Sequence, residues 1–158
     1  MSERRITAAM LEVRDRADGF AGLPPGRARP DQLLSAFQEA EPYLHLPIHG
    51  YKLVTWLVKQ TQPSDWQRGS RPMVWPTRRR LCELLGISPS QVKVLNRALF
   101  AAGILVIRDG AGRSANGSEA RYGLDLTPLA QRSGEFERIA RAADKERAEV
   151  ERLKQRYR

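Results

Sequence analysis

The chain has 158 residues, with 27 lysines and arginines against 18 aspartates and glutamates, so its net charge is +9. This excess favours an anionic partner, either nucleic acid or an acidic membrane surface. No apolar run is long enough to cross a bilayer, and no signal peptide is visible. The single cysteine excludes an internal disulfide framework and fits a reducing compartment. Residues 78–121 carry eight cations against three acids, which favours a duplex-binding face over a membrane surface. We therefore expect a cytoplasmic protein with no membrane partner.

Two helices are predicted in the N-terminal third. Thr7 is a candidate N-cap for a helix that extends to about Ala17, because its hydroxyl can accept from first-turn N–H groups. A connector rich in glycine and proline follows over residues 19–30, and a second helix is expected over 31–40. We interpret residues 1–45 as an N-terminal helical arm.

A buried central helix and a short strand are predicted next. The stretch from Pro47 to Gln60 is apolar nearly all round, which indicates a helix enclosed by a core. Residues 73–75 can form a first strand that pairs with later strands. We expect the tryptophans to anchor the core and its loops rather than stack on bases. They are Trp56, Trp66 and Trp75.

Residues 77–103 predict a helix, a tight turn and a second helix. Thr77 can cap the first helix, and Gly86 can close it in the left-handed conformation. Ser88 can cap the second helix and form a Ser-x-x-Gln capping box with Gln91. These signals are local and agree with one another.

The second of these helices has two different faces. Its apolar residues recur at helical spacing, which places them together against the core. They are Val92, Leu95 and Leu99. The opposite face carries small and cationic side chains, which suit the major groove of DNA, about 12 Å wide. The predicted base-reading residues are Ser90, Gln91, Lys93, Val94 and Arg97. The alternative is that Lys93 and Arg97 are simply solvated cations.

A β-hairpin completes the pattern. Residues 104–107 predict a strand, 109–120 a glycine-rich wing tip, and 121–126 a second strand. The expected fold is mainly α: a winged helix-turn-helix over residues 46–132, with a small antiparallel wing sheet. The predicted phosphate contacts are Arg78, Arg79, Arg80, Arg113 and Arg121. For Arg113 the alternative is a hairpin tip without a contact.

The C-terminal region, residues 133–158, predicts a long helix. Thr127 and Pro128 begin a helix that Gly134 can interrupt. A heptad seam follows, with spacings that alternate between three and four. Its members are Phe136, Ile139, Ala143, Glu146, Val150, Leu153 and Tyr157. One interpretation is a homodimer through the Phe136–Tyr157 helix. The other is that the helix packs on the chain's own N-terminal helices.

Motifs for catalysis and for cofactors are missing from the sequence. Neither glycine-rich phosphate-loop pattern occurs. His45 and His49 are four residues apart, but Pro47 lies between them and no cysteine or acidic ligand accompanies them, so no metal is expected. Cys82 lies among leucines, which favours an inert thiol. We expect a binding protein that is not an enzyme and has no catalytic residue, metal or cofactor.

Several stretches in fixed order resemble one known family. They are 5–11 (RITAAML), 22–24 (GLP), 61–66 (TQPSDW), 71–76 (RPMVWP), 102–109 (AGILVIRD) and 122–129 (YGLDLTPL). From about residue 5 to 140 the chain resembles the N-terminal region of RepC-family plasmid replication initiators of the repABC plasmids of alphaproteobacteria. The wing here is shorter and less basic than is usual in that family.

The resemblance implies a winged-helix domain that binds the plasmid origin, which in these plasmids lies inside the initiator's own gene. Family members are longer and carry a separate C-terminal domain. The function we expect is therefore sequence-preferring binding of double-stranded DNA in plasmid replication initiation. The alternatives are a transcriptional repressor with the same fold, and a protein-interaction module that dimerises through the C-terminal helix.

Overall fold

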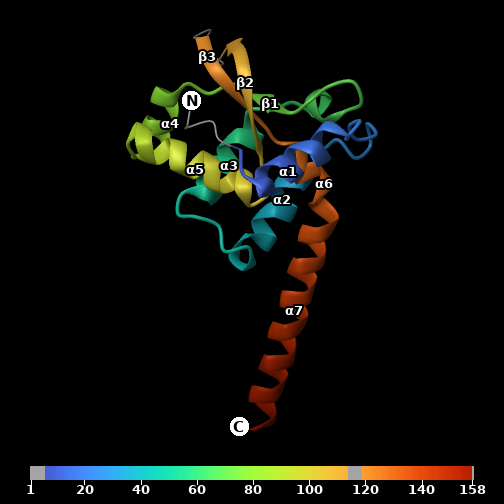
Figure 1. Ribbon diagram of the computed structural model, residues 1–158. Coiled ribbons are helices and arrows are strands. Elements are labelled where there is room, and N and C mark those ends of the chain that lie inside the picture. Colours follow the sequence, from blue (N-terminus) through green and yellow to red (C-terminus); the bar gives the residue numbers. More distant parts are fainter. Residues whose placement is uncertain (1–5, 114–118, 158) are drawn as a thin grey trace.

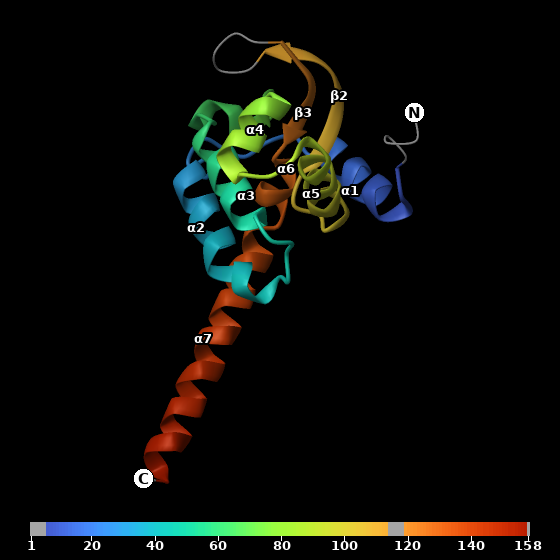
Figure 2. The ribbon, with the colours of Figure 1, turned by 90° about the vertical axis from the view of Figure 1, so that its left-hand side faces the viewer.

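The computed structural model describes the backbone of residues 6–113 and 119–157, and the side chains of residues 6–110 and 122–157. Its elements are α1 (Ala8–Asp18), α2 (Pro30–Ala40), η2 (Glu41–Tyr43), α3 (Gly50–Lys59), η3 (Pro63–Trp66), β1 (Met73–Val74), α4 (Arg78–Leu85), α5 (Pro89–Ala101), β2 (Val106–Arg113), β3 (Glu119–Asp125), α6 (Thr127–Gln131) and α7 (Ser133–Arg156). The helices gather into a body. The β2–β3 hairpin rises from one end, and α7 leaves from the other (Figures 1 and 2).

The three strands form one antiparallel sheet in the order β1-β3-β2. The central strand β3 pairs through Asp125 with both Met73 and Val106. Together with α3, α4 and α5, the sheet completes the predicted order of helix, strand, helix, helix and hairpin. The expected fold class, a mainly α winged helix-turn-helix with a long C-terminal helix, is confirmed.

One core joins the helices to the sheet. Its fully buried members include Leu57 of α3, Leu81 of α4, Leu99 of α5 and Leu124 of β3. Each buried leucine of this kind contributes about 1.5–3 kcal/mol relative to an exposed one. Met10 of α1 belongs to the same cluster, so the N-terminal helices share the core of the winged helix.

A buried carboxylate ties the base of the hairpin to its surroundings. Asp125 is fully buried and accepts from Arg108 Nε at 2.8 Å and from Arg71 Nη1 at 3.4 Å. Its other oxygen accepts from the backbone N–H of Thr127 at 2.9 Å. Arg108 also donates to Asp18 at the end of α1, at 2.7 Å. The cluster therefore links β2, β3, α1 and the start of α6.

The long helix α7 is packed only over its first turns. Phe136 is fully buried and meets Phe37 of α2 edge to face, with ring centroids 6.0 Å apart. Beyond Ala140 nearly every side chain is exposed, and the helix extends away from the body (Figure 1). The predicted heptad seam is thus divided between a buried start and an exposed remainder.

Three boundaries differ from the predicted ones. The helix expected from Pro47 begins at Gly50, because His49 adopts a left-handed φ of 74°. The strand expected from Ile104 begins at Val106, because the Ile104 N–H donates to the Leu99 carbonyl and so closes α5. The final helix is interrupted at Arg132, before Gly134 rather than at it.

The tryptophans lie in the core and its margins, as expected. Trp66 is 1% exposed, and its Nε1–H donates to Thr61 Oγ1 at 2.9 Å. Trp56 and Trp75 are half-buried. An indole that buries its ring and satisfies its N–H stabilises a fold without contributing to a binding surface.

Candidate nucleic-acid interface

The helix-turn-helix is built by the caps that the sequence predicts. Thr77 Oγ1 accepts from the Arg80 N–H at 3.1 Å, and Gly86, at φ 66°, closes α4. Ser88 Oγ accepts from the Gln91 N–H at 3.2 Å, while Gln91 Oε1 accepts from the Ser88 N–H at 2.9 Å. Both bonds of the capping box are present, and they fix the point at which α5 leaves the turn.

The inner face of α5 is wider than its apolar spacing predicts. The predicted residues Val92, Leu95 and Leu99 are buried, and so are Asn96 and Phe100. The extra width arises because α5 packs between α4 and α1 and also contacts β2. Since these are tertiary contacts, the pattern of α5 alone does not reveal them.

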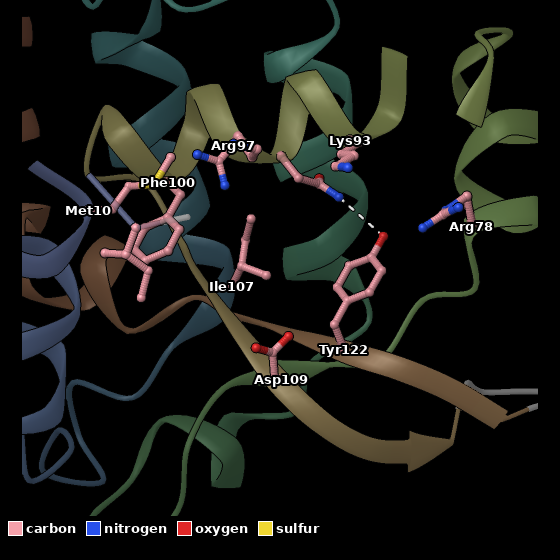
Figure 3. A pocket seen from close by; sticks show the side chains of 10 residues that line it. Met10, Arg78, Lys93, Arg97, Phe100, Ile107, Asp109 and Tyr122 are labelled. Carbon is pink, nitrogen blue, oxygen red and sulfur yellow. Dashed lines mark hydrogen bonds between the residues drawn. The ribbon is translucent and has the colours of Figure 1, made fainter. Parts of the chain in front are cut away.

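The outer face of α5 carries four of the five predicted base-reading residues. Ser90, Gln91 and Lys93 are exposed, and Val94 is 68% exposed. Arg97 is half-buried, and it points from α5 toward the hairpin (Figure 3).

Three arginines occupy the first turn of α4, beside this face. Arg78, Arg79 and Arg80 are all exposed, and no acidic residue accompanies them in that turn. Arg79 pairs with Glu83 at 3.2 Å, and the Arg80 guanidinium lies 5.8 Å from the Trp56 ring centroid. Cations near a helix N-terminus oppose the macrodipole, whereas anions are favoured there. A phosphate at this site would relieve the repulsion and accept from the arginines.

The wing is a longer ladder than predicted. The β2 and β3 strands pair as far as Arg113 opposite Glu119, so they enter the range expected to be a loop. Their register shifts between Asp109 and Gly112, which indicates a bulge. Two predicted phosphate contacts, Arg113 and Arg121, have backbones within these strands, and their side chains lie outside the described residues.

A pocket lies between α5 and the hairpin (Figure 3). Its volume is about 120 Å³. Its lining comes from α1, α4, α5 and both long strands, and consists of Ile6, Met10, Arg78, Lys93, Asn96, Arg97, Phe100, Ile107, Asp109 and Tyr122. The pocket joins three predicted DNA contacts to residues that carry no functional signal in the sequence.

Two polar side chains meet inside this pocket. Asn96 Nδ2 donates to Tyr122 Oη at 3.2 Å, and Asn96 is 2% exposed. Burial raises the pKa of the Tyr122 hydroxyl, although the nearby Arg78 charge and the bond from Asn96 oppose this rise. The tyrosine therefore remains a neutral hydroxyl at physiological pH. Its partner across the hairpin is Asp109, which also faces the pocket.

Other kinds of site receive no support from the described residues. No group of three or more histidine, cysteine, aspartate or glutamate side chains could hold a metal ion among residues 6–110 and 122–157. His45 and His49 both lie at positive φ, in the loop that precedes α3. In the same part of the chain, no helix is long and apolar enough to cross a membrane.

Comparison with protein families gives a match over nearly the whole chain. The family model for the replication protein C N-terminal domain matches residues 4–158. No curated protein and no solved structure matches the chain. The match covers nearly the whole sequence, including the helix-turn-helix, the wing and α7.

Proposed function

The chain belongs to the replication protein C N-terminal domain family, which supports a role in plasmid replication initiation, and we propose that it acts there as a sequence-preferring binder of duplex DNA at the plasmid origin. The observation that carries this proposal is the joint exposure of the outer face of α5 and the arginines of α4. We infer that the protein binds DNA without catalysing a reaction, and that it is associated with plasmid DNA in the bacterial cytoplasm.

In this proposal α5 enters the major groove. Ser90 and Val94 leave room for the helix backbone to approach the bases, and Val94 suits contact with a thymine methyl group. Lys93 can reach the acceptors of guanine. The Gln91 carbonyl oxygen is engaged in the cap, so its amide N–H groups are the part that would reach a base.

The arginines of α4 would bind the phosphates that flank the groove. Arg79 is the most direct candidate, because its side chain is 90% exposed and its partner Glu83 lies on the same exposed helix. An exposed pair of this kind contributes at most about 0.5 kcal/mol. A phosphate can therefore replace Glu83 at little cost. Arg97 would bind the phosphate backbone of the DNA from the pocket side, between α5 and the wing.

The test is a fluorescence titration of origin duplex at several salt concentrations. Arg79→Ala should weaken binding to all sequences and reduce the salt slope by about one unit. Lys93→Ala should cost about 1–3 kcal/mol on the preferred sequence and less on others. Arg152→Ala is the matched control, because it removes the same charge from an exposed helix on the far side of the body (Figure 2). Equal losses from Arg79→Ala and Arg152→Ala would refute the proposed interface.

A transcriptional repressor would use the same surface. Selection of bound sequences from random duplexes, followed by footprinting, separates the two roles. Origin repeats support an initiator, whereas promoter half-sites support a repressor. The family match favours the initiator.

A second candidate role, self-association, is favoured by the exposed part of α7. Val150, Leu153 and Tyr157 are 46%, 41% and 81% exposed, and they continue the heptad seam. We propose that a homodimer of the Phe136–Tyr157 helix would use this distal part, since Phe136 is buried in the body. Light scattering of Leu153→Glu against the parent tests it. A dimer of the parent that becomes a monomer supports the role, and a monomeric parent excludes it.

A further inference from the structure

The pocket between α5 and the hairpin has a lining unlike that of a phosphate site. Its floor is apolar: Met10 and Phe100 are each 3% exposed, and Ile107 is half-buried. Its cations, Arg78, Lys93 and Arg97, come from α4 and α5 (Figure 3). An apolar floor beneath charged groups favours a ligand that is flat and uncharged at one end and anionic at the other.

A buried amide provides the polar contact within this floor. The Asn96 amide nitrogen bonds to Tyr122, and its buried Oδ1 has no hydrogen-bond partner among the side chains that the structure describes. If the amide were turned by half a rotation, the oxygen would meet Tyr122 and the nitrogen would lose its partner. In either orientation one buried polar atom of this amide is available to a ligand, and such an atom costs about 1–3 kcal/mol when unmet.

The carboxylate of Asp109 narrows the choice of ligand. It lies among the lining residues, beside Tyr122 on the hairpin. A carboxylate repels a phosphate placed inside the pocket, whereas it accepts from the ring or exocyclic N–H of a nucleobase. Phosphates are therefore favoured at the cationic rim, and a base in the interior.

The volume of the pocket sets the size of the base. An apolar cavity of ~150 Å³ holds one benzene molecule, and this pocket is smaller, about 120 Å³, but open to solvent, with Lys93 and Asp109 as exposed lining residues. A single six-membered ring therefore fills the pocket and extends into its opening, and the two fused rings of a purine would protrude further. The ring would lie on Phe100 and Met10, with contacts that alanine substitution generally values at about 1–3 kcal/mol per base.

We propose that this pocket binds an unstacked pyrimidine nucleotide, with the base held by Asn96, Tyr122 and Asp109 and the adjoining phosphate held by Arg78, Lys93 and Arg97. The inference rests on the proposed duplex-binding face, which shares those cations. It adds an affinity for single-stranded or opened DNA. A free nucleotide and a base extruded from a strand present the same chemistry, so the experiment must separate them.

The experiment measures the anisotropy of labelled oligonucleotides of on the order of 10 nucleotides. The probes are oligo-dC, oligo-dT, oligo-dA and an abasic strand of equal length, with intact duplex measured alongside. Pyrimidine strands should bind at least about fivefold more tightly than the abasic strand, and oligo-dA should bind more weakly than oligo-dC. Competition separates the two ligand forms. If deoxycytidine monophosphate displaces labelled oligo-dC, a free nucleotide is sufficient for binding. If only unlabelled oligo-dC displaces it, the pocket requires a strand.

Asn96→Leu is the decisive variant, because leucine keeps the branched shape and the number of side-chain heavy atoms of asparagine and removes the amide. It should lower the affinity for oligo-dC about five- to tenfold, leave duplex affinity within about twofold, and leave the melting temperature unchanged or higher, since an unmet buried polar group is lost. If this variant does not fold, Tyr122→Phe is used with the same readouts. It removes the hydroxyl from the pocket and keeps the ring, and it should lower the affinity for oligo-dC in the same direction.

The failures of the two proposals are distinguishable. Equal binding of the abasic strand and oligo-dC, or oligo-dC binding unaffected by a folded variant, overturns the pocket and leaves duplex binding intact. Loss of duplex and single-strand affinity together in Asn96→Leu also overturns it, because the amide would then serve the fold. A parent chain that binds neither form of DNA overturns both proposals.

Discussion

Replacement of Asp125 with asparagine should lower the free energy of unfolding by about 3–5 kcal/mol, as expected when a buried ion pair loses one charge. The carboxylate is fully buried and accepts from Arg108 at 2.8 Å, from Arg71 at 3.4 Å and from the Thr127 N–H at 2.9 Å. A bond to a charged group contributes about 1.5–3 kcal/mol, against about 1 kcal/mol for a neutral bond. Each arginine bond thus loses about 0.5–2 kcal/mol. The new amide also places an N–H group against an arginine, where neither can accept a hydrogen bond, and this adds about 1–3 kcal/mol to the loss of stability.

The assay is urea unfolding followed by circular dichroism, supported by a thermal melt. In a chain of this size 1 kcal/mol corresponds to a shift in Tm of roughly 2–4 °C, so the expected decrease is about 6–20 °C. Glu12→Gln is the matched control, because Glu12 and Arg16 form a similar pair at 3.3 Å with side chains 73% and 65% exposed. That control should change stability by less than about 0.5 kcal/mol. Similar losses of stability for the two substitutions would refute the inference that burial makes the Asp125 interactions more important for stability than an exposed ion pair.

Three further predictions concern the hairpin, α5 and the α6–α7 junction. Gly123→Ala should destabilise the fold by about 1–3 kcal/mol, because the added Cβ would overlap the Met73 methyl group and lie 3.1 Å from two atoms of the Trp75 ring; an unchanged urea midpoint would contradict this. Ser88→Ala should cost about 1 kcal/mol, measured in the same way, and Ser88→Gly only a few tenths. The hydrogen bond from Arg132 holds the pKa of Glu135 below its ordinary value of 4.5. The difference in unfolding free energy between the parent and Glu135→Gln should therefore be full at neutral pH and vanish as pH falls through the lowered pKa of Glu135. A difference that persists in acid would argue against a stabilising Arg132–Glu135 pair.

The elements whose signals lie within a few residues of one another were predictable. Thr77, Gly86 and Ser88 each act through a side chain or a φ angle on the adjacent turn, and all three adopt the expected roles. The order of helices and strands follows from such signals. These local signals therefore predicted the helix-turn-helix and the hairpin.

The parts that depend on distant segments were not predictable from the pattern. Asn96 looks like an ordinary helix residue, and its burial arises from Tyr122, 26 residues later. Arg97 was expected on the outer face, yet it lines the pocket that Met10 and Phe100 help to form. A helical periodicity identifies a face but not the number of neighbours that cover it.

The same limit applies to the final helix. The heptad spacing indicates which side chains share a face, and it contains no information about where the body ends. Phe136 meets α2, whereas Val150 meets no element of the body. The two interpretations of the seam therefore apply to different turns of the same helix: packing describes its start, and self-association remains a proposal for the remainder.

The distal part of α7 extends away from the body. The direction in which its side chains point is therefore set by the number of residues that precede them in the helix. Each residue adds a rise of about 1.5 Å and a rotation of about 100°, and beyond Ala143 every described side chain is exposed, so packing on the body does not correct either quantity there. One alanine inserted after Ala142 would turn Val150 and Leu153 by roughly a quarter of a circle relative to α5. Seven inserted residues would nearly restore their heading while displacing them by about 10 Å. The direction of any contact made by those turns is therefore fixed relative to α5 by the number of intervening residues.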